Sequence, residues 1–140
     1  MPGPMSTRLV PPLLRIVAAA VGGAVLAGCA GTATVRLQTH DLQLRLDEYR
    51  IQPESVSVPP GRLRVTANND GVLTHNVVLE YPHRDSGGNE VVIRAIPTML
   101  PGATGRPVTV LLAPGRYLLV SNIANQTDLG MSATLIVRAH

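Results

Sequence analysis

The stretch "RYLLVSNIANQTDLGMSATLIV", Arg116 to Val137, is the most informative part of the chain. It predicts two strands joined by a polar loop, because apolar runs flank a segment rich in Asn, Gln, Thr and Asp. The loop runs from Ser121 to Met131 and closes on Gly-Met before the second strand begins. Its polar side chains, set between two strands, are the first candidates for a site.

The residues around this stretch, from 35 to 140, predict an all-β domain. Period-two alternation and short apolar runs recur there, and Pro, Gly, Asn or Asp interrupts them. No segment after residue 34 has a convincing 3.6-residue apolar period, which argues against helices. We therefore expect about six to eight short strands in an antiparallel sandwich or barrel. They are expected within 35–46, 55–67, 75–81, 90–96, 106–112, 115–122 and 131–140.

The segment "LAPGRY", residues 112–117, predicts a tyrosine corner. In this motif the Tyr hydroxyl bonds back to the backbone across a crossover between strands. The chain has only three Tyr, and the Leu-x-Pro-Gly-x-Tyr spacing fits the motif. The alternative is an ordinary Pro-Gly turn with Tyr117 at the surface.

The N-terminal residues predict an export signal rather than part of the domain. Arg8 and Arg15 precede the apolar segment "IVAAAVGGAVL", residues 16–26. That segment is too short and too glycine-rich for a comfortable membrane-spanning helix. It ends in Leu-Ala-Gly-Cys, which resembles the lipobox of bacterial lipoproteins.

The resemblance to a lipobox implies three parts. Residues 1–28 would be a cleaved lipoprotein signal peptide, residues 29–34 a lipidated tether, and residues 35–140 the folded domain. Cys29, the only cysteine, would carry the lipid, with acyl chains such as palmitate holding the protein at the outside of the bacterial cell membrane. A plain secretory signal or an N-terminal anchor, with Cys29 incidental, remains the alternative.

The charge of the chain does not favour a nucleic-acid partner. All 12 basic residues are Arg, and the formal net charge is +3. Removal of Arg8 and Arg15 with the signal leaves 10 Arg against 9 acids, a net charge of about +1. These arginines are scattered and lack aromatic companions, so we interpret them as solvated strand faces.

Two segments together resemble the plastocyanin-type cupredoxin family. "NNDGVLTHNVVLE", residues 68–80, resembles the segment that carries the family's first histidine ligand, and "PGRYLLVSNIANQTDLGMSATLIV", residues 114–137, resembles its C-terminal ligand loop and last strand. The resemblance extends over nearly all of residues 35–140. It implies a cupredoxin-like Greek-key β-sandwich with the metal-binding end at the loops.

The same resemblance implies a degenerate blue-copper site. Such a site uses two His, one Cys thiolate and usually a weak axial Met. His75 and Met131 occupy the first His and the Met positions, whereas Ser121 and Gln126 occupy the Cys and second His positions. A serine hydroxyl keeps its proton near neutral pH and a Gln offers only an amide, so an ordinary blue-copper carrier is not expected.

The retained residues also have structural interpretations. His75 is better interpreted as a polar group that holds two loops together than as a metal ligand. Met131 is better interpreted as a core residue. Asn76 is expected to tie the loops together, with Ser121 or its neighbours as partners. The other histidines, His40, His83 and His140, have no readable spacing and are expected at the surface.

Two functions follow from these residues. The first is a non-catalytic binding module whose loop end binds an unknown protein or small ligand, with no cofactor expected. The alternative is a weak copper-binding or copper-handling protein that uses His75 and Met131. An enzyme is not expected, because the sequence has no readable catalytic constellation and no nucleotide-binding loop.

Overall fold

The computed structural model describes Gly3 and residues 31–139. The predicted signal peptide of residues 1–28, apart from Gly3, and the predicted lipidation site Cys29 lie outside the described residues. A compact unit begins at Gly31. In the described part of the chain, no helix has the length and apolar character needed to cross a membrane.

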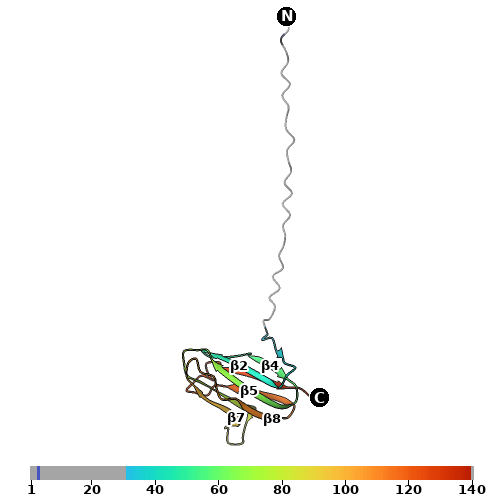
Figure 1. Ribbon diagram of the computed structural model, residues 1–140, viewed down its shortest axis with the longest axis vertical. Helices are drawn as coiled ribbons and strands as arrows, with labels where there is room; N and C mark the ends of the chain where they lie inside the picture. Colours follow the sequence, from blue (N-terminus) through green and yellow to red (C-terminus); the bar gives the residue numbers. More distant parts are fainter. Residues whose placement is uncertain (1–2, 4–30, 140) are drawn as a thin grey trace. The chain divides into compact units, whose positions relative to one another are not determined.

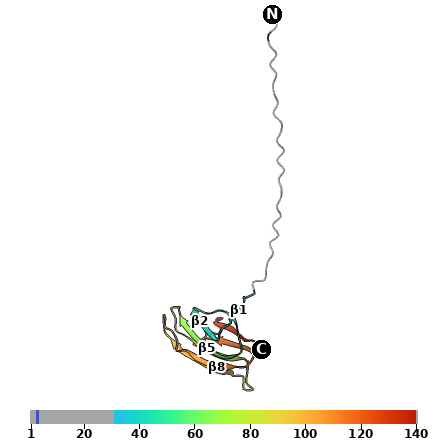
Figure 2. The same cartoon turned by 45° about the vertical axis from the view of Figure 1, so that its right-hand side comes forward.

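The described residues form ten β-strands and no helix, so the all-β prediction is confirmed. Figures 1 and 2 show the strands as two layers. The strands are β1 (Val35–Arg36), β2 (Asp41–Asp47), β3 (Arg50–Gln52), β4 (Ser55–Val58), β5 (Gly61–Asn69), β6 (His75–Arg84), β7 (Glu90–Met99), β8 (Val108–Leu112), β9 (Gly115–Val120) and β10 (Ser132–Val137).

The strands make a sandwich of two sheets. One sheet has six strands in the order β1-β4-β10-β9-β6-β7, and the other has four in the order β3-β2-β5-β8. Neighbours in each sheet are mostly distant in sequence, so the connections cross from one sheet to the other. The strand β2, with buried residues at every second position, shows how period-two alternation directs one face of each sheet into the core.

The core lies between the sheets and is almost entirely aliphatic. Leu44, Leu46 and Ile51 from one sheet and Val56 and Leu135 from the other have no exposed surface. The chain has no Phe and no Trp, so branched aliphatic side chains must fill this space. Tyr117 is the one aromatic residue among the buried core residues in the described part of the chain.

The predicted sandwich is confirmed, but the expectation that it is antiparallel and has six to eight strands is wrong. Three pairs are parallel: β1 with β4, β4 with β10, and β2 with β5. The alternating segment 35–46 is also not one strand, because the chain leaves β1 after Arg36 and enters the other sheet as β2. Alternation reports which face of a strand is buried, and it carries no information on strand direction or on a change of sheet.

One end of the sandwich, here called the loop pole, gathers four connections. The backbone N–H of Asp70 donates to the Leu46 carbonyl at 2.8 Å, and that of Gly102 donates to the Asn69 carbonyl at 2.8 Å. These bonds join each connection to the end of a strand from another part of the sequence. The four connections of the loop pole are residues 48–49, 70–74, 100–107 and 121–131.

The predicted tyrosine corner is confirmed. The Tyr117 hydroxyl donates a hydrogen bond to the Ala113 carbonyl at 2.8 Å, across the turn between β8 and β9. Tyr117 is buried, and burial raises the pKa of its hydroxyl, with a smaller effect from Tyr81. The bond therefore anchors the start of β9, the strand that leads to the loop of residues 121–131.

We predict that Tyr117→Phe lowers the free energy of unfolding by about 1 kcal/mol, because the Ala113 carbonyl loses its donor while the ring stays in the core. Urea denaturation of the purified protein measures this. The control is Tyr81→Phe, since Tyr81 is partly exposed and no hydrogen bond to its hydroxyl is found among the described residues. Equal stability of Tyr117→Phe and wild type would show that the corner does not stabilise the fold.

Candidate functional site

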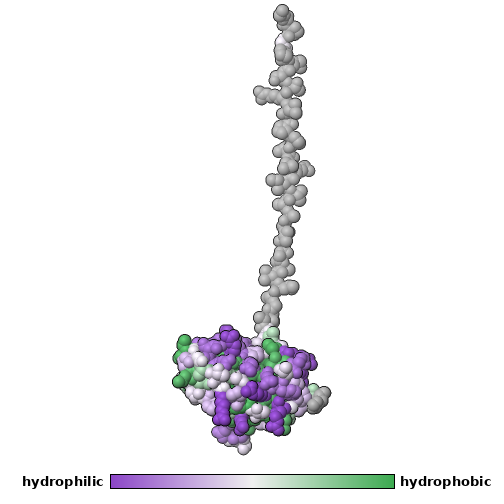
Figure 3. All heavy atoms as spheres, viewed as in Figure 1, coloured by the Kyte–Doolittle hydropathy of each residue, from purple (hydrophilic) through white to green (hydrophobic). Residues whose placement is uncertain are grey.

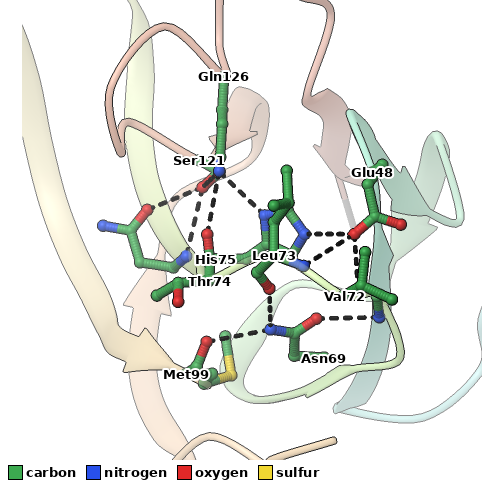
Figure 4. Close-up of polar contacts among 11 residues, drawn as sticks. Glu48, Asn69, Val72, Leu73, Thr74, His75, Met99, Ser121 and Gln126 are labelled. Carbon is green, nitrogen blue, oxygen red and sulfur yellow. Dashed lines mark hydrogen bonds and ion pairs between the residues drawn. The ribbon is translucent and has the colours of Figure 1, made fainter. Parts of the chain in front are cut away.

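The structure brings three of the four predicted ligand positions into contact. His75 is the first residue of β6, Ser121 follows the end of β9, and Gln126 lies in the loop of residues 121–131. Figure 4 shows the three side chains meeting at the loop pole. His75, Ser121 and Met131 have no exposed surface, and Gln126 is also buried. The site is therefore closed to solvent.

The side-chain amide of Gln126 is the centre of the site. Its Nε2 donates to the Thr74 carbonyl at 3.0 Å, and its Oε1 accepts from the Ser121 hydroxyl at 2.7 Å. The same Oε1 lies 2.9 Å from His75 Nδ1. A backbone carbonyl can only accept, so Nε2 must face Thr74, and this fixes Oε1 toward His75 and Ser121.

This orientation assigns the proton on the His75 ring. Gln126 Oε1 has no proton to give, so His75 Nδ1 must carry one to form the 2.9 Å bond. The other ring nitrogen, Nε2, is buried without a hydrogen-bond partner among the described residues. It faces Glu48 Oε1 at 3.7 Å. His75 therefore presents an N–H, and not a lone pair, toward Ser121 and Gln126.

Glu48 closes the other side of His75, and no pattern in the sequence pointed to it. Its Oε1 accepts from the backbone N–H groups of Val72 at 2.7 Å and Leu73 at 3.0 Å. These bonds, Leu73 first and then Val72, hold the pKa of the Glu48 carboxyl below its ordinary value, and His75 adds a smaller effect in the same direction. Glu48 lies in the two-residue turn between β2 and β3, where a charged residue is ordinary and so gives no signal.

The expectation for Asn76 agrees with the structure. Its Oδ1 accepts from the Asn122 backbone N–H at 3.1 Å and lies 3.1 Å from the Ser121 hydroxyl, which shares its one proton between this oxygen and Gln126 Oε1. Its Nδ2 donates to Asn122 Oδ1 at 2.8 Å. The start of β6 is thus fastened to the end of β9 by side-chain bonds as well as by the sheet.

Met131 is placed differently from the other three positions. Its backbone N–H donates to the Gln126 carbonyl at 3.0 Å, and its carbonyl accepts from the Ser121 N–H at 3.1 Å. Its side chain is fully buried in the hydrophobic core cluster. Met131 therefore closes the loop through its backbone and fills the core with its thioether.

These residues do not fit a blue-copper ion. Such a site needs a thiolate and two imidazole lone pairs, whereas this pocket holds a hydroxyl, an amide and one imidazole whose facing nitrogen is protonated. The donors are also bonded to one another rather than directed at a common empty point. Within residues 31–139, no group of three His, Cys, Asp or Glu side chains could hold a metal ion.

The surface of the loop pole carries exposed apolar side chains around this closed interior. The most exposed are Val72, with 77% of its surface accessible, and Leu100, with 67%. Val72 and Leu100 each come directly after a residue that takes part in the buried hydrogen bonds of the loop pole. Figure 3 shows hydrophobic residues at the left-hand edge of the domain, as well as elsewhere on this face. The rim, as we call this set, consists of Tyr49, Val72, Leu73, Leu100 and Leu129.

Comparisons with known proteins identify the fold. No protein-family model matches the chain, and no curated protein matches it. Among solved structures, auracyanin from Roseiflexus castenholzii is similar with a TM-score of 0.63 and 19% identity, over 74% of this chain and 100% of that one. Auracyanin A from Chloroflexus aurantiacus, a "blue" copper protein, has a TM-score of 0.57 and 16% identity, over 76% and 100%.

Reduced rusticyanin is a third similar structure, with a TM-score of 0.55 and 15% identity over 79% of this chain and 87% of that one. Identities this low support a shared fold and not a shared ligand. The chain therefore has the cupredoxin-like β-sandwich fold that its sequence resemblance predicted.

We predict that Gln126→Leu lowers the free energy of unfolding by about 2–4 kcal/mol. Leu matches the size of Gln, but the His75 N–H, the Ser121 hydroxyl and the Thr74 carbonyl lose a buried partner. Chemical denaturation measures the loss. The control is Asn125→Ala, an exposed neighbour in the same loop, which is expected to change stability by less than about 0.5 kcal/mol. A Gln126→Leu protein as stable as the control would contradict the network.

Proposed function

We propose that this protein is an extracytoplasmic lipoprotein whose cupredoxin-like domain acts as a non-catalytic binding module. In this proposal the loop pole binds a partner protein through its apolar rim, and a lipid on Cys29 holds the domain at the membrane. The observation that carries the proposal is the combination of a closed polar interior with an exposed apolar surface at the same end of the sandwich.

The closed interior supports binding through the surface rather than chemistry inside the pole. His75 and Ser121 are neighbours, a pairing that in an open site could act as base and nucleophile. Here the Ser121 hydroxyl is bonded to Gln126 and Asn76, and both His75 and Ser121 are fully buried. No substrate can reach them in this arrangement, which favours a structural role for both.

The rim supports a protein partner. Exposed apolar side chains that cluster on one surface mark interaction sites, whereas singly scattered ones need no explanation. Val72 and Leu73 are held in place by their backbone bonds to Glu48, so this part of the rim is presented by a well-bonded loop. A preformed apolar surface loses little conformational entropy on binding.

The position of the tether supports a partner close to the membrane. Thr32 lines a surface hollow with Tyr49 and Leu129, two rim residues. A lipid on Cys29 would be attached only three residues before Thr32, a chain length of about 10 Å at full extension. Anchoring at Cys29 would therefore hold the rim near the membrane, where a membrane protein or another lipoprotein is the natural partner.

Copper handling through His75 and Met131 is the second candidate, motivated by the fold shared with a "blue" copper protein. It would require His75 Nδ1 to lose its proton and Gln126 to move away. Each change breaks a buried hydrogen bond without supplying a replacement. The geometry therefore favours the binding module.

We predict that a photoreactive residue at Leu100 in the full-length chain gives a defined crosslinked product in its own cells. The same residue at Ser86, in the exposed turn at the far end of β6, should give none. Val72→Glu should weaken the Leu100 product, because it places a charge in the apolar contact. Cys29→Ser should weaken it as well by releasing the domain from the membrane. Products of equal yield from Leu100 and Ser86 would contradict the proposal.

We also predict that Ser121→Cys combined with Gln126→His produces an intense blue thiolate-to-copper band with Cu(II), which neither single variant nor wild type shows. The two positions already lie against each other and against His75, so the new thiolate and imidazole would face the retained one. Visible absorption of the copper-loaded variants measures this. A folded double variant without the band would show that Ser121 and Gln126 do not occupy the ligand positions.

A further inference from the structure

Glu80 is a largely buried residue on the outer face of the six-stranded sheet, and its carboxylate lines a pocket there. It follows Leu79, which points into the core, so the alternation of β6 directs Glu80 to the opposite face. Only 8% of its surface is exposed. The loop after β9 contributes Asn122 and Thr127 to the pocket that Glu80 lines, so this loop partly covers the carboxylate.

The Glu80 carboxylate has no hydrogen bond or ion pair to any described residue. The basic residue that lines the pocket, Arg84, is already paired with Glu90 at 3.0 Å and bonded to the Gly88 carbonyl. Burial raises the pKa of Glu80, repulsion by Glu90 raises it further, and Arg84 opposes this. The carboxylate oxygens are not among the fully buried atoms that lack a partner, so they face the pocket, where a ligand could pair with them.

The pocket above Glu80 has the size and charge of a site for a small cation. Its volume is about 330 Å³, at the lower end of the range for small-molecule pockets. Glu80, Glu90 and Asp128 line it with one basic residue, Arg84, so the lining is net acidic. Asn122 and Thr127 add polar groups at the edge.

We infer that this pocket binds a small organic cation, with a guanidinium or ammonium head group paired to the Glu80 carboxylate. A metal ion fits less well, because within residues 31–139 no three acidic or His side chains converge on one point. A guanidinium or ammonium group pairs well with a carboxylate that is free of other partners and has polar neighbours, and the pocket offers both. This site is separate from the apolar rim and does not depend on the proposed partner.

A ligand in this pocket would also stabilise the loop of residues 121–131 at the loop pole. Asn122 and Thr127 line the pocket, and they bond to Asn76 and to the Ser121 carbonyl, respectively. The loop that carries them also carries Gln126. A bound cation would therefore hold the loop of residues 121–131 against the sheet from its outer side.

The test is calorimetric titration of the full-length protein in detergent with methylguanidinium and with methylurea, its neutral isostere. We expect saturable binding of methylguanidinium only. Glu80→Gln should weaken it at least tenfold, whereas Asp41→Asn, an exposed acid on the other sheet, should leave it unchanged. No saturable binding, equal binding of methylurea, or unaltered affinity in Glu80→Gln would overturn the inference.

A second readout checks that Glu80→Gln is folded. The raised pKa means that the folded protein loses stability as pH rises, because the native state holds the proton more tightly than the unfolded chain. Glu80→Gln should therefore have a higher Tm than wild type at pH 7, and this difference should vanish below the ordinary pKa of 4.5. A lower Tm for Glu80→Gln at pH 7 would contradict an unpaired carboxylate.

The source of the cation is tested with the tripeptide Gly-Arg-Gly. Tighter binding of the tripeptide than of methylguanidinium would assign the pocket to an arginine side chain of a protein. Weaker binding would assign it to a free small molecule, because the peptide backbone would not fit beside the loop. Either result supports the cation pocket, and binding of neither probe overturns it.

Discussion

The side-chain amide of Gln126 is the contact on which the loop pole depends. It bonds to the loop before β6 through Thr74, to the first residue of β6 through His75, and to the end of β9 through Ser121. A carbonyl oxygen and an amide N–H on one planar group satisfy an imidazole N–H, a hydroxyl and a carbonyl together. In a buried site it matters more that every polar group has a partner than how strong any one bond is. Leaving a buried polar group unpaired costs more free energy than one formed bond contributes.

The closed interior at the loop pole leaves only the surface of this end of the sandwich available for binding. The sandwich still gathers four connections at the loop pole, and its backbone bonds hold them in a fixed arrangement. The polar groups inside are bonded to each other, so what remains available to other molecules is the surface that they support. Glu48 connects the closed interior to the rim. The same carboxylate faces His75 and accepts hydrogen bonds from the backbone of Val72 and Leu73 in the rim.

Sequence reasoning succeeded where a local pattern has one physical cause. Alternation placed most strands, and the Leu-x-Pro-Gly-x-Tyr spacing predicted the Tyr117 bond. It failed where distant elements decide the outcome. Parallel pairing of β2 with β5 leaves no trace in alternation, and Glu48 becomes important only because β5 and β6 bring Val72 and Leu73 to it. Glu80 offered a weak signal that was missed, a charged residue in the apolar run "VVLEY".

The most direct test of the account is the protonation of His75 Nδ1 with and without copper. Long-range ¹H–¹⁵N NMR of the protein with labelled histidine reports which ring nitrogen carries hydrogen. The account predicts a proton on Nδ1, bonded to Gln126, that persists when stoichiometric Cu(I) is added. Loss of that proton on addition of Cu(I), with a shift of the Nδ1 resonance, would show that His75 binds metal and that the network opens to admit it.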